Sequence, residues 1–326
     1  MQGKIALEEH FAPPADWDNR LKYVSARLPN WPEFARRQEQ TFDLGLKEMD
    51  ENGVEHTIVS LGAPGIQAIL DPKDALEVAQ RSNDLIKKNC ERRPGRFSAF
   101  AAVPMQDPEL AARELERCVK DLGFKGCMVN GFTQFKDADS AIYCDLPRYD
   151  PVWEMHVKLD VPFYLHPRNP PASQLRIFEG HPWLLGSTWA FGVETATHAL
   201  RMMGSGMFDR HPKLQVIIGH LGESLPSSIW RVDHRIKKGG EVTHSKKPLA
   251  EYFRNNFHLT TSGNFHDSTL TQAITEVGVD RIMFSADYPF EDFGQAAQWF
   301  DKTPMLNDAD RMKIGRTNAQ KLFKMT

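Results

Sequence analysis

The chain has 326 residues, enough for a large buried core, and an α/β barrel of this size is commonly a single domain. Its formal net charge is −3 at pH 7 and it has no long basic run, which argues against binding to nucleic acid or an anionic membrane surface. A small-molecule ligand is therefore favoured.

The chain shows no sign of export or of oxidising conditions. No stretch is apolar enough to span a membrane, and the N-terminus lacks a signal-peptide profile. The four cysteines, at positions 90, 118, 127 and 144, have neither zinc-knuckle spacing nor the density of a disulfide scaffold. We expect a cytoplasmic protein with reduced cysteines.

Eight short apolar runs, rich in β-branched and aromatic residues, alternate with segments of helical periodicity. The predicted strands cover residues 4–10, 56–62, 96–104, 124–131, 161–167, 214–220, 257–263 and 280–287. Helix candidates include 40–53, 72–93, 108–123, 191–206 and 226–238. This alternation predicts a TIM-like (β/α)8 barrel, with an open doubly wound sheet as the main alternative. Without an internal repeat or a break in composition, residues 1–326 are predicted to form one domain.

Three segments interrupt the alternation: residues 11–38, 168–190 and 239–248. Loops of this length in a compact domain are commonly lids or partner contacts. The segments 11–38 and 168–190 follow the first and fifth predicted strands, so in a barrel they would lie on the catalytic face. We predict that these two are lid loops.

Residues of metal-binding types stand at the ends of several predicted strands. The first strand ends in Glu8 and His10, whose side chains alternate onto one face while that of Glu9 points to the other. Three further strands end in His166, His220 and Asp287. Each residue alone could be an exposed terminus, a helix cap or a hydrogen-bonded histidine. Because a barrel gathers its strand ends, together they predict a mononuclear divalent-metal site with mixed nitrogen and oxygen ligands.

Four motifs resemble those of the metal-dependent aromatic acid decarboxylases of the amidohydrolase superfamily. They are Glu8-x-His10, LHPRNP at 165–170, GHLGE at 219–223 and SADYPF at 285–290. The similarity continues through VNGF at 129–132, TSGNF at 261–265 and the closing IGRTNAQKLFK, and therefore covers essentially the whole chain. Within the superfamily the chain most resembles enzymes that act on γ-resorcylate (2,6-dihydroxybenzoate).

The resemblance implies an amidohydrolase-type barrel that holds one divalent ion, zinc or manganese, per chain. The implied metal ligands are Glu8, His166 and Asp287, with His10 beside or on the metal. The implied catalytic residues are Asp287, His220 and Glu223. Substrate contacts are expected from Tyr23, Asn130, Trp189, Phe290 and Arg231. The arginine is expected to reach the site of a neighbouring subunit, since such enzymes are commonly homotetramers or homodimers.

Four residues bear on the choice of substrate. Relatives that act on 2,3-dihydroxybenzoate or salicylate tend to have Ala where His10 stands, which favours the 2,6-isomer. The pair Lys22-Tyr23 differs from the Gly-Phe expected in γ-resorcylate enzymes, and Tyr288 replaces their Trp. Either change could alter which ring hydroxyl is accepted, so both dihydroxybenzoates are retained as candidates.

The expected reaction is reversible, non-oxidative decarboxylation of an ortho-hydroxybenzoate to the phenol. Asp287 would protonate the ring carbon, with His220 held by Glu223, while the metal binds the carboxylate and the ortho oxygen. The main alternative is a metal-dependent hydrolase of a small amide or lactone. Against it, the first strand lacks a His-x-His pair, and Lys125 lies at the wrong end of its strand to bridge metals. A non-catalytic binding protein would not need five ligand-type residues at strand ends.

Overall fold

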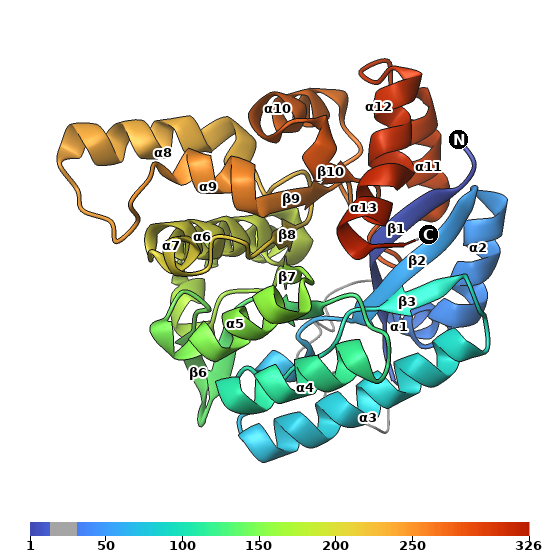
Figure 1. Ribbon diagram of the computed structural model, residues 1–326, viewed down its shortest axis with the longest axis horizontal. Coiled ribbons are helices and arrows are strands. Elements are labelled where there is room, and N and C mark those ends of the chain that lie inside the picture. Colours follow the sequence, from blue (N-terminus) through green and yellow to red (C-terminus); the bar gives the residue numbers. More distant parts are fainter. Residues whose placement is uncertain (14–30, 326) are drawn as a thin grey trace.

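The computed structural model describes residues 1–13 and 31–325. Tyr23 and most of the predicted lid at 11–38 therefore lie outside the described residues. Parallel strands stand at the centre, surrounded by helices (Figure 1). The parallel strands are β1 (Lys4–Phe11), β2 (Val54–Leu61), β3 (Phe97–Ala99), β4 (Cys127–Asn130), β7 (Phe163–His166), β8 (Val216–Ile218), β9 (Phe257–Thr260) and β10 (Ile282–Met283). Each lies within or overlaps one of the eight predicted segments.

The strands close into a barrel in chain order. Hydrogen-bonded ladders connect β1-β2-β3 and β10-β9-β8-β7-β4. The two sheets meet where Ala101 pairs in parallel with Cys127, and again where the His10 amide donates to the Tyr288 carbonyl oxygen at 2.7 Å. The predicted barrel is confirmed, and the open-sheet alternative is excluded.

The helices cover the outside of the barrel. They are α1 (Trp31–Glu39), α2 (Leu46–Glu51), α3 (Pro72–Glu91), α4 (Pro108–Lys120), α5 (Asp150–Leu159), α6 (Ala190–Gly204), α7 (Met207–Arg210), α8 (Leu225–Gly239), α9 (Leu249–Asn256), α10 (Asp267–Val277), α11 (Phe293–Lys302), α12 (Asp308–Met312) and α13 (Asn318–Phe323). The starts of α3 and α4 share one sequence signal, an Asp that caps the helix followed by Pro, since Asp71 and Asp107 each accept two backbone amide hydrogen bonds. The helix predicted at 40–53 is divided into a π-helical turn, Thr41–Gly45, and α2.

Apolar side chains fill the barrel below the strand ends. A buried cluster takes Ile5 and Leu7 from β1, Met128 from β4 and Ile217 from β8, among others. Phe323 of α13 belongs to the same cluster, so this helix covers the end of the barrel opposite to the polar strand ends. A larger apolar layer lies between the strands and the outer helices. The polar side chains at the carboxyl ends of the strands thus lie above a well-packed apolar core, which holds the strands in place.

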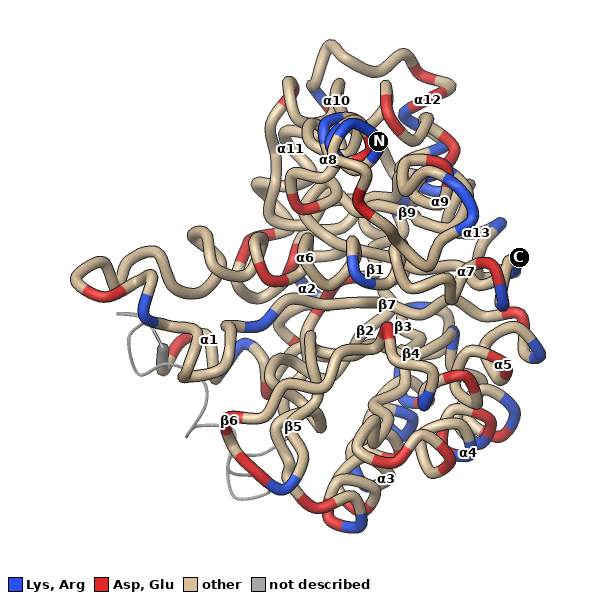
Figure 2. The backbone as a smooth tube through the Cα atoms, turned by 90° about the vertical axis from the view of Figure 1, so that its left-hand side faces the viewer, with Lys and Arg blue, Asp and Glu red and all other residues tan. Residues whose placement is uncertain are grey.

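Two segments stand outside the barrel pattern. An antiparallel hairpin, β5 (Thr133–Phe135) with β6 (Asp137–Ile142), follows β4 and was not predicted. The predicted lid at 168–190 contains three short 3-10 helices, Ala172–Phe178, Pro182–Leu184 and Gly186–Thr188. Basic and acidic residues are interspersed along the outer helices (Figure 2). Among the described residues, no helix combines the length and apolarity needed to cross a membrane.

Candidate metal centre and active site

Four buried residues converge at the carboxyl end of the barrel. Glu8 and His10 come from β1, His166 ends β7, and Asp287 follows β10. Each offers one ligand atom, and these four atoms lie within 4.8 Å of one another. His10 Nε2 is 3.1 Å from Asp287 Oδ1, and His166 Nε2 is 3.6 Å from Glu8 Oε1. The structure therefore brings together all four residues expected to hold a metal.

An irregularity in β1 turns Glu8 and His10 into the barrel. Ile5 and Leu7 face the barrel interior, so strict alternation would point Glu9 inward next. The pairing of β1 with β2 slips between Ala6 and Glu9, and the amides of Leu7 and Glu8 both donate to Ser285 Oγ, at 2.8 and 2.6 Å. Such an irregularity re-aims the side chains that follow it.

The two carboxylate oxygens of Glu8 have different environments. Oε2 accepts hydrogen bonds from the hydroxyls of Tyr164, Ser262 and Thr260, the last at 2.9 Å. Oε1 is fully buried and has no hydrogen-bond partner, although a buried acceptor rarely stays unpaired. Gly219 allows this close packing, because a Cβ there would lie 2.6 Å from Oε2. This arrangement fits a carboxylate that is anchored through one oxygen and binds a cation through the other.

Each of the two histidines has one ring nitrogen directed at a carboxylate of the cluster. Ser60 Oγ lies 3.2 Å from His10 Nδ1, which leaves Nε2 directed at Asp287. The rings of His10 and His166 meet edge to face with centroids 4.5 Å apart. Burial, together with the charge of His10, holds the pKa of His166 well below its usual value. Its imidazole is therefore neutral, the form that binds metals.

Asp287 and His220 lie side by side, and each shifts the pKa of the other. Burial favours the neutral acid, but hydrogen bonds and charge from His10 and His220 outweigh it, so the pKa of Asp287 is lowered. His220 Nε2 lies 3.5 Å from Asp287 Oδ2, and His220 Nδ1 lies 2.6 Å from Glu223 Oε1. Burial alone would lower the pKa of His220, but the charges of Glu223 and Glu8 and the hydrogen bond to Asp287 raise it well above its usual value. Both directions favour a protonated His220 beside an ionised Asp287.

Two of the expected substrate contacts border the metal cluster. Asn130 pairs in register with His166, and its buried Oδ1 has no hydrogen-bond partner. The ring of Phe290 lies 6.0 Å from that of His10. Tyr288 instead stacks on Phe293, with ring centroids 5.3 Å apart.

The remaining predicted contacts are not assembled at the cluster. Trp189 is 56% exposed at the start of α6, and Arg231 is exposed on α8. Within the described chain, neither has a hydrogen bond, ion pair or ring contact with a ligand residue. Tyr23 lies outside the described residues.

The residues that anchor Glu8 were missed in the sequence. Tyr164 precedes His166 by two positions in the same strand, so alternation placed both side chains on one face. Thr260 and Ser262 show the same spacing at the end of β9, inside a stretch that carried part of the resemblance. A hydroxyl residue two positions from another polar residue at a strand end could therefore have indicated the side chains that anchor Glu8.

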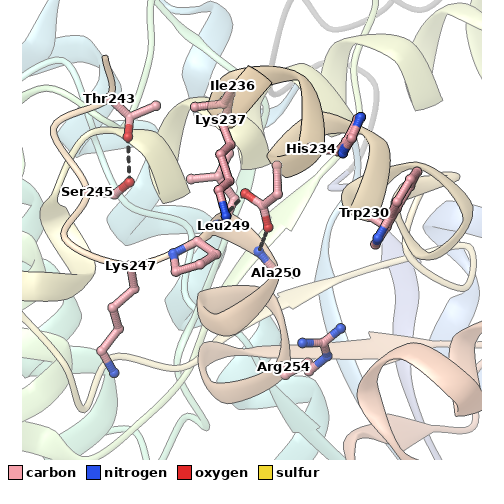
Figure 3. A pocket seen from close by; sticks show the side chains of 12 residues that line it. Trp230, His234, Ile236, Lys237, Thr243, Ser245, Lys247, Leu249, Ala250 and Arg254 are labelled. Carbon is pink, nitrogen blue, oxygen red and sulfur yellow. Dashed lines mark hydrogen bonds between the residues drawn. The ribbon is translucent and has the colours of Figure 1, made fainter. Parts of the chain in front are cut away.

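A separate cavity of about 510 Å³ lies between α8 and the start of α9 (Figure 3). Trp230 and His234 stack on its rim with ring centroids 5.0 Å apart. Asp233 lies at this cavity and caps α9 by accepting the amides of Leu249 and Ala250. None of the lining residues belongs to the metal cluster, so this cavity is distinct from the candidate active site.

Comparison with known proteins places the chain in a family. The amidohydrolase family model matches residues 10–325. The chain is 53% identical to a γ-resorcylate decarboxylase of Rhizobium radiobacter, an alignment that covers all of this chain and 99% of the relative. The chain therefore belongs to the amidohydrolase family, and the resemblance seen in the motifs is confirmed.

Two solved structures agree with this placement. A 2,6-dihydroxybenzoate decarboxylase in complex with 2,6-dihydroxybenzoate superposes with a TM-score of 0.94 at 52% identity, covering 100% of this chain and 99% of that one. A dihydroxybenzoic acid decarboxylase of Polaromonas sp. JS666, with bound manganese and the inhibitor 2-nitroresorcinol, gives 0.94 at 53%, covering 100% and 98%. These relatives are carboxy-lyases and give no support to the hydrolase alternative.

Proposed function

We propose that this protein is a metal-dependent, non-oxidative decarboxylase that converts 2,6-dihydroxybenzoate to 1,3-dihydroxybenzene and CO2. The observation that carries the proposal is the position of Asp287, which lies among the metal-binding atoms and 3.5 Å from His220 Nε2. That position suits an acid that protonates a substrate bound at the metal. Identity of about one half to γ-resorcylate decarboxylases over the full chain supports this choice of substrate.

We further propose that Glu8, His10, His166 and Asp287 hold one divalent ion per chain, zinc or manganese. Two imidazole nitrogens and two carboxylate oxygens suit either metal, and the unpartnered Glu8 Oε1 supports a cation at this point. When bound, the ion supplies positive charge that attracts and orients the carboxylate and a neighbouring hydroxyl oxygen of the substrate.

The proton reaches the ring through two residues. His220, kept protonated by Glu223, gives its proton to Asp287, and Asp287 gives it to the ring carbon that bears the carboxylate. An ortho hydroxyl assists because its oxygen donates electron density to that carbon. The carbon–carbon bond then breaks, its electron pair restores the aromatic ring, and CO2 leaves.

Polar and aromatic groups around the cluster fit a hydroxylated ring. The unpartnered Oδ1 of Asn130 can accept a hydrogen bond from a ring hydroxyl, and Phe290 provides an apolar surface next to His10. Trp189, at the end of the segment predicted as a lid, would complete the pocket when substrate binds, and Tyr23 stays a predicted substrate contact. His10 favours the 2,6-isomer over 2,3-dihydroxybenzoate.

We also propose that the protein is a homodimer or homotetramer in which Arg231 reaches the site of a neighbouring subunit. Trp230, the residue before it, is 69% exposed on α8, an unusual position for so large an apolar side chain in a monomer. A guanidinium can bind a carboxylate in ways that lysine cannot. Sedimentation of a fully active monomer would refute this arrangement. The cytoplasmic location stays a prediction.

The direct test is a substrate panel. Purified protein loaded with Mn2+ or Zn2+ is incubated with 2,6-dihydroxybenzoate, 2,3-dihydroxybenzoate and salicylate, and CO2 release is recorded. We expect the 2,6-isomer to have the highest kcat/KM. Preference for 2,3-dihydroxybenzoate would show that the proposed substrate isomer is wrong. If metal-loaded protein releases no CO2 from any ortho-hydroxybenzoate, the proposed reaction is refuted.

A further inference from the structure

The side chain of Glu9 lies on the opposite face of β1 from the metal ligands and is as deeply buried as they are. It is 0% exposed, and both of its oxygens accept hydrogen bonds from the segment that carries Asp287. Oε1 accepts from the amide of Ala286 at 3.0 Å and from Ser285 Oγ at 3.1 Å. Oε2 accepts from the amide of Tyr288 at 2.6 Å. One carboxylate thus holds the amide groups of the residues immediately before and after Asp287.

The backbone held by Glu9 is strained. Asp287 has φ of 81°, in the left-handed region that residues with a Cβ rarely adopt. Such a conformation persists when the surrounding contacts determine it. The two amide contacts hold the peptide group that follows Asp287 and the one between Ser285 and Ala286, and the carbonyl oxygen of Asp287 accepts from the amides of Phe290 and Glu291. These contacts direct the carboxylate of Asp287 toward His10 and His220.

Closing the barrel does not by itself require a carboxylate at this position. The three groups that donate hydrogen bonds to Glu9 are all neutral, so no cation compensates the charge of this buried carboxylate. An apolar side chain would fill the same space without the desolvation penalty of a buried acid. A neutral apolar group, however, could not hold two converging backbone amides.

We propose that Glu9 is a positioning residue that sets the backbone conformation of Asp287, and through it the geometry of metal coordination and proton delivery. The part that concerns proton delivery rests on the proposed function, whereas the part that concerns coordination does not. Glu9 therefore acts on the metal site without touching metal or substrate.

The test is Glu9→Gln. Each oxygen of Glu9 accepts a backbone amide, so whichever way the glutamine amide turns, its NH2 group faces a donor and one contact is lost. The matched control is Glu114→Gln in α4, because Glu114 is also buried, at 2% exposed, and accepts hydrogen bonds from Asn83 and Arg117. Thermal unfolding of both variants measures how much stability is lost when a buried glutamate is replaced by glutamine, whatever its position.

The decisive readout is the visible absorption spectrum of the Co2+-substituted protein, which reports ligand geometry without catalysis. We expect a shifted spectrum in Glu9→Gln and an unchanged one in Glu114→Gln, together with a fall in kcat of about 10- to 100-fold for Glu9→Gln and little change in KM. Unchanged spectrum and kcat in Glu9→Gln would overturn the proposal. So would a fall in kcat that Glu114→Gln matches at equal loss of stability.

Two further outcomes are separable. If the unsubstituted protein releases no CO2 but the Glu9→Gln spectrum shifts, the positioning role stands and the proposed reaction fails. If Glu9→Gln is not recovered folded, Glu9→Asp keeps the carboxylate but withdraws it by one methylene group from the amides of Ala286 and Tyr288. We expect a smaller spectral shift in the same direction there, and an unchanged spectrum would count against the proposal.

Discussion

Tyr164 is the most direct way to test how Glu8 is prepared for metal binding. Its hydroxyl donates to Glu8 Oε2 and lies 3.0 Å from Thr260 Oγ1, in a fully buried site. Burial and the charge of Glu8 raise the pKa of Tyr164 well above its usual value, so the hydroxyl remains a donor across the working pH range. Tyr164→Phe removes this donor and keeps the ring that packs against Phe100.

The expected loss follows from the type of hydrogen bond. A hydrogen bond to a charged group contributes about 1.5–3 kcal/mol, which corresponds to roughly 10- to 100-fold in affinity. Because Thr260 and Ser262 still donate to the same oxygen, we expect metal affinity to fall by about 10-fold or somewhat more. Once metal is saturating, kcat should change less than the affinity does.

The assay is competition for metal against a chromogenic chelator. Tyr252→Phe is the matched control, because Tyr252 donates to Asp209 Oδ1 at 2.6 Å and is 4% exposed, away from the metal cluster. Equal metal affinity in Tyr164→Phe and the unsubstituted protein would refute the reasoning. An equal loss in both variants would show a general effect of removing a buried hydroxyl.

Three further predictions address the metal, the proton and the pH dependence. Elemental analysis should find about one divalent ion per chain, and activity should vanish on chelation and return on adding Mn2+ or Zn2+; full activity without metal would refute the site. Asp287→Asn should keep metal and substrate binding but lose about 10²–10⁴-fold in kcat, and should not exchange solvent deuterium into the product ring; near-normal turnover would move the acid role to His220. Burial lowers the pKa of His156 from 6.5 to about 4 and the pKa of His198 from 6.5 to about 3. As the pH drops below 6.5, these histidines bind protons in the unfolded chain before they do so in the folded protein, so the free energy of unfolding falls. Urea unfolding of metal-free protein at pH 7 and pH 4.5 should show a loss of roughly 2–3 kcal/mol per histidine, and His198→Gln should flatten this dependence.

The eight strands and the barrel could be predicted because both follow from local patterns. Each strand is a short apolar run between helical segments, and eight such alternations leave few topologies. The ligand types could be predicted for the same reason, since a barrel brings the ends of its strands to one face. His166, His220 and Asp287 each stand at or just beyond such an end, far apart in sequence.

The hairpin after β4 and the division of the helix at 40–53 could not be predicted in the same way. The hairpin strand Asp137–Ile142 begins DADS, a polar stretch that is exposed or half-buried and has no apolar alternation. Its pairing with Thr133–Phe135 depends on a turn in which Lys136 takes φ of 63°. Lysine is not a residue type that indicates a positive φ in a sequence.

The inward direction of Glu8 and His10 could not be predicted from the local sequence of β1. Alternation correctly separates Glu8 and His10 from Glu9, but it does not say which set faces the barrel interior. Counted from Ile5 and Leu7, it would have placed Glu9 inside and the two ligands outside. The slip that reverses this order is held by Ser285, which accepts the amides of both Leu7 and Glu8. Ser285 follows β10, nearly the whole length of the chain away. The segment after β10 that carries Asp287 thus also sets the direction of the ligands on β1, so the metal cluster can form only once the barrel has closed.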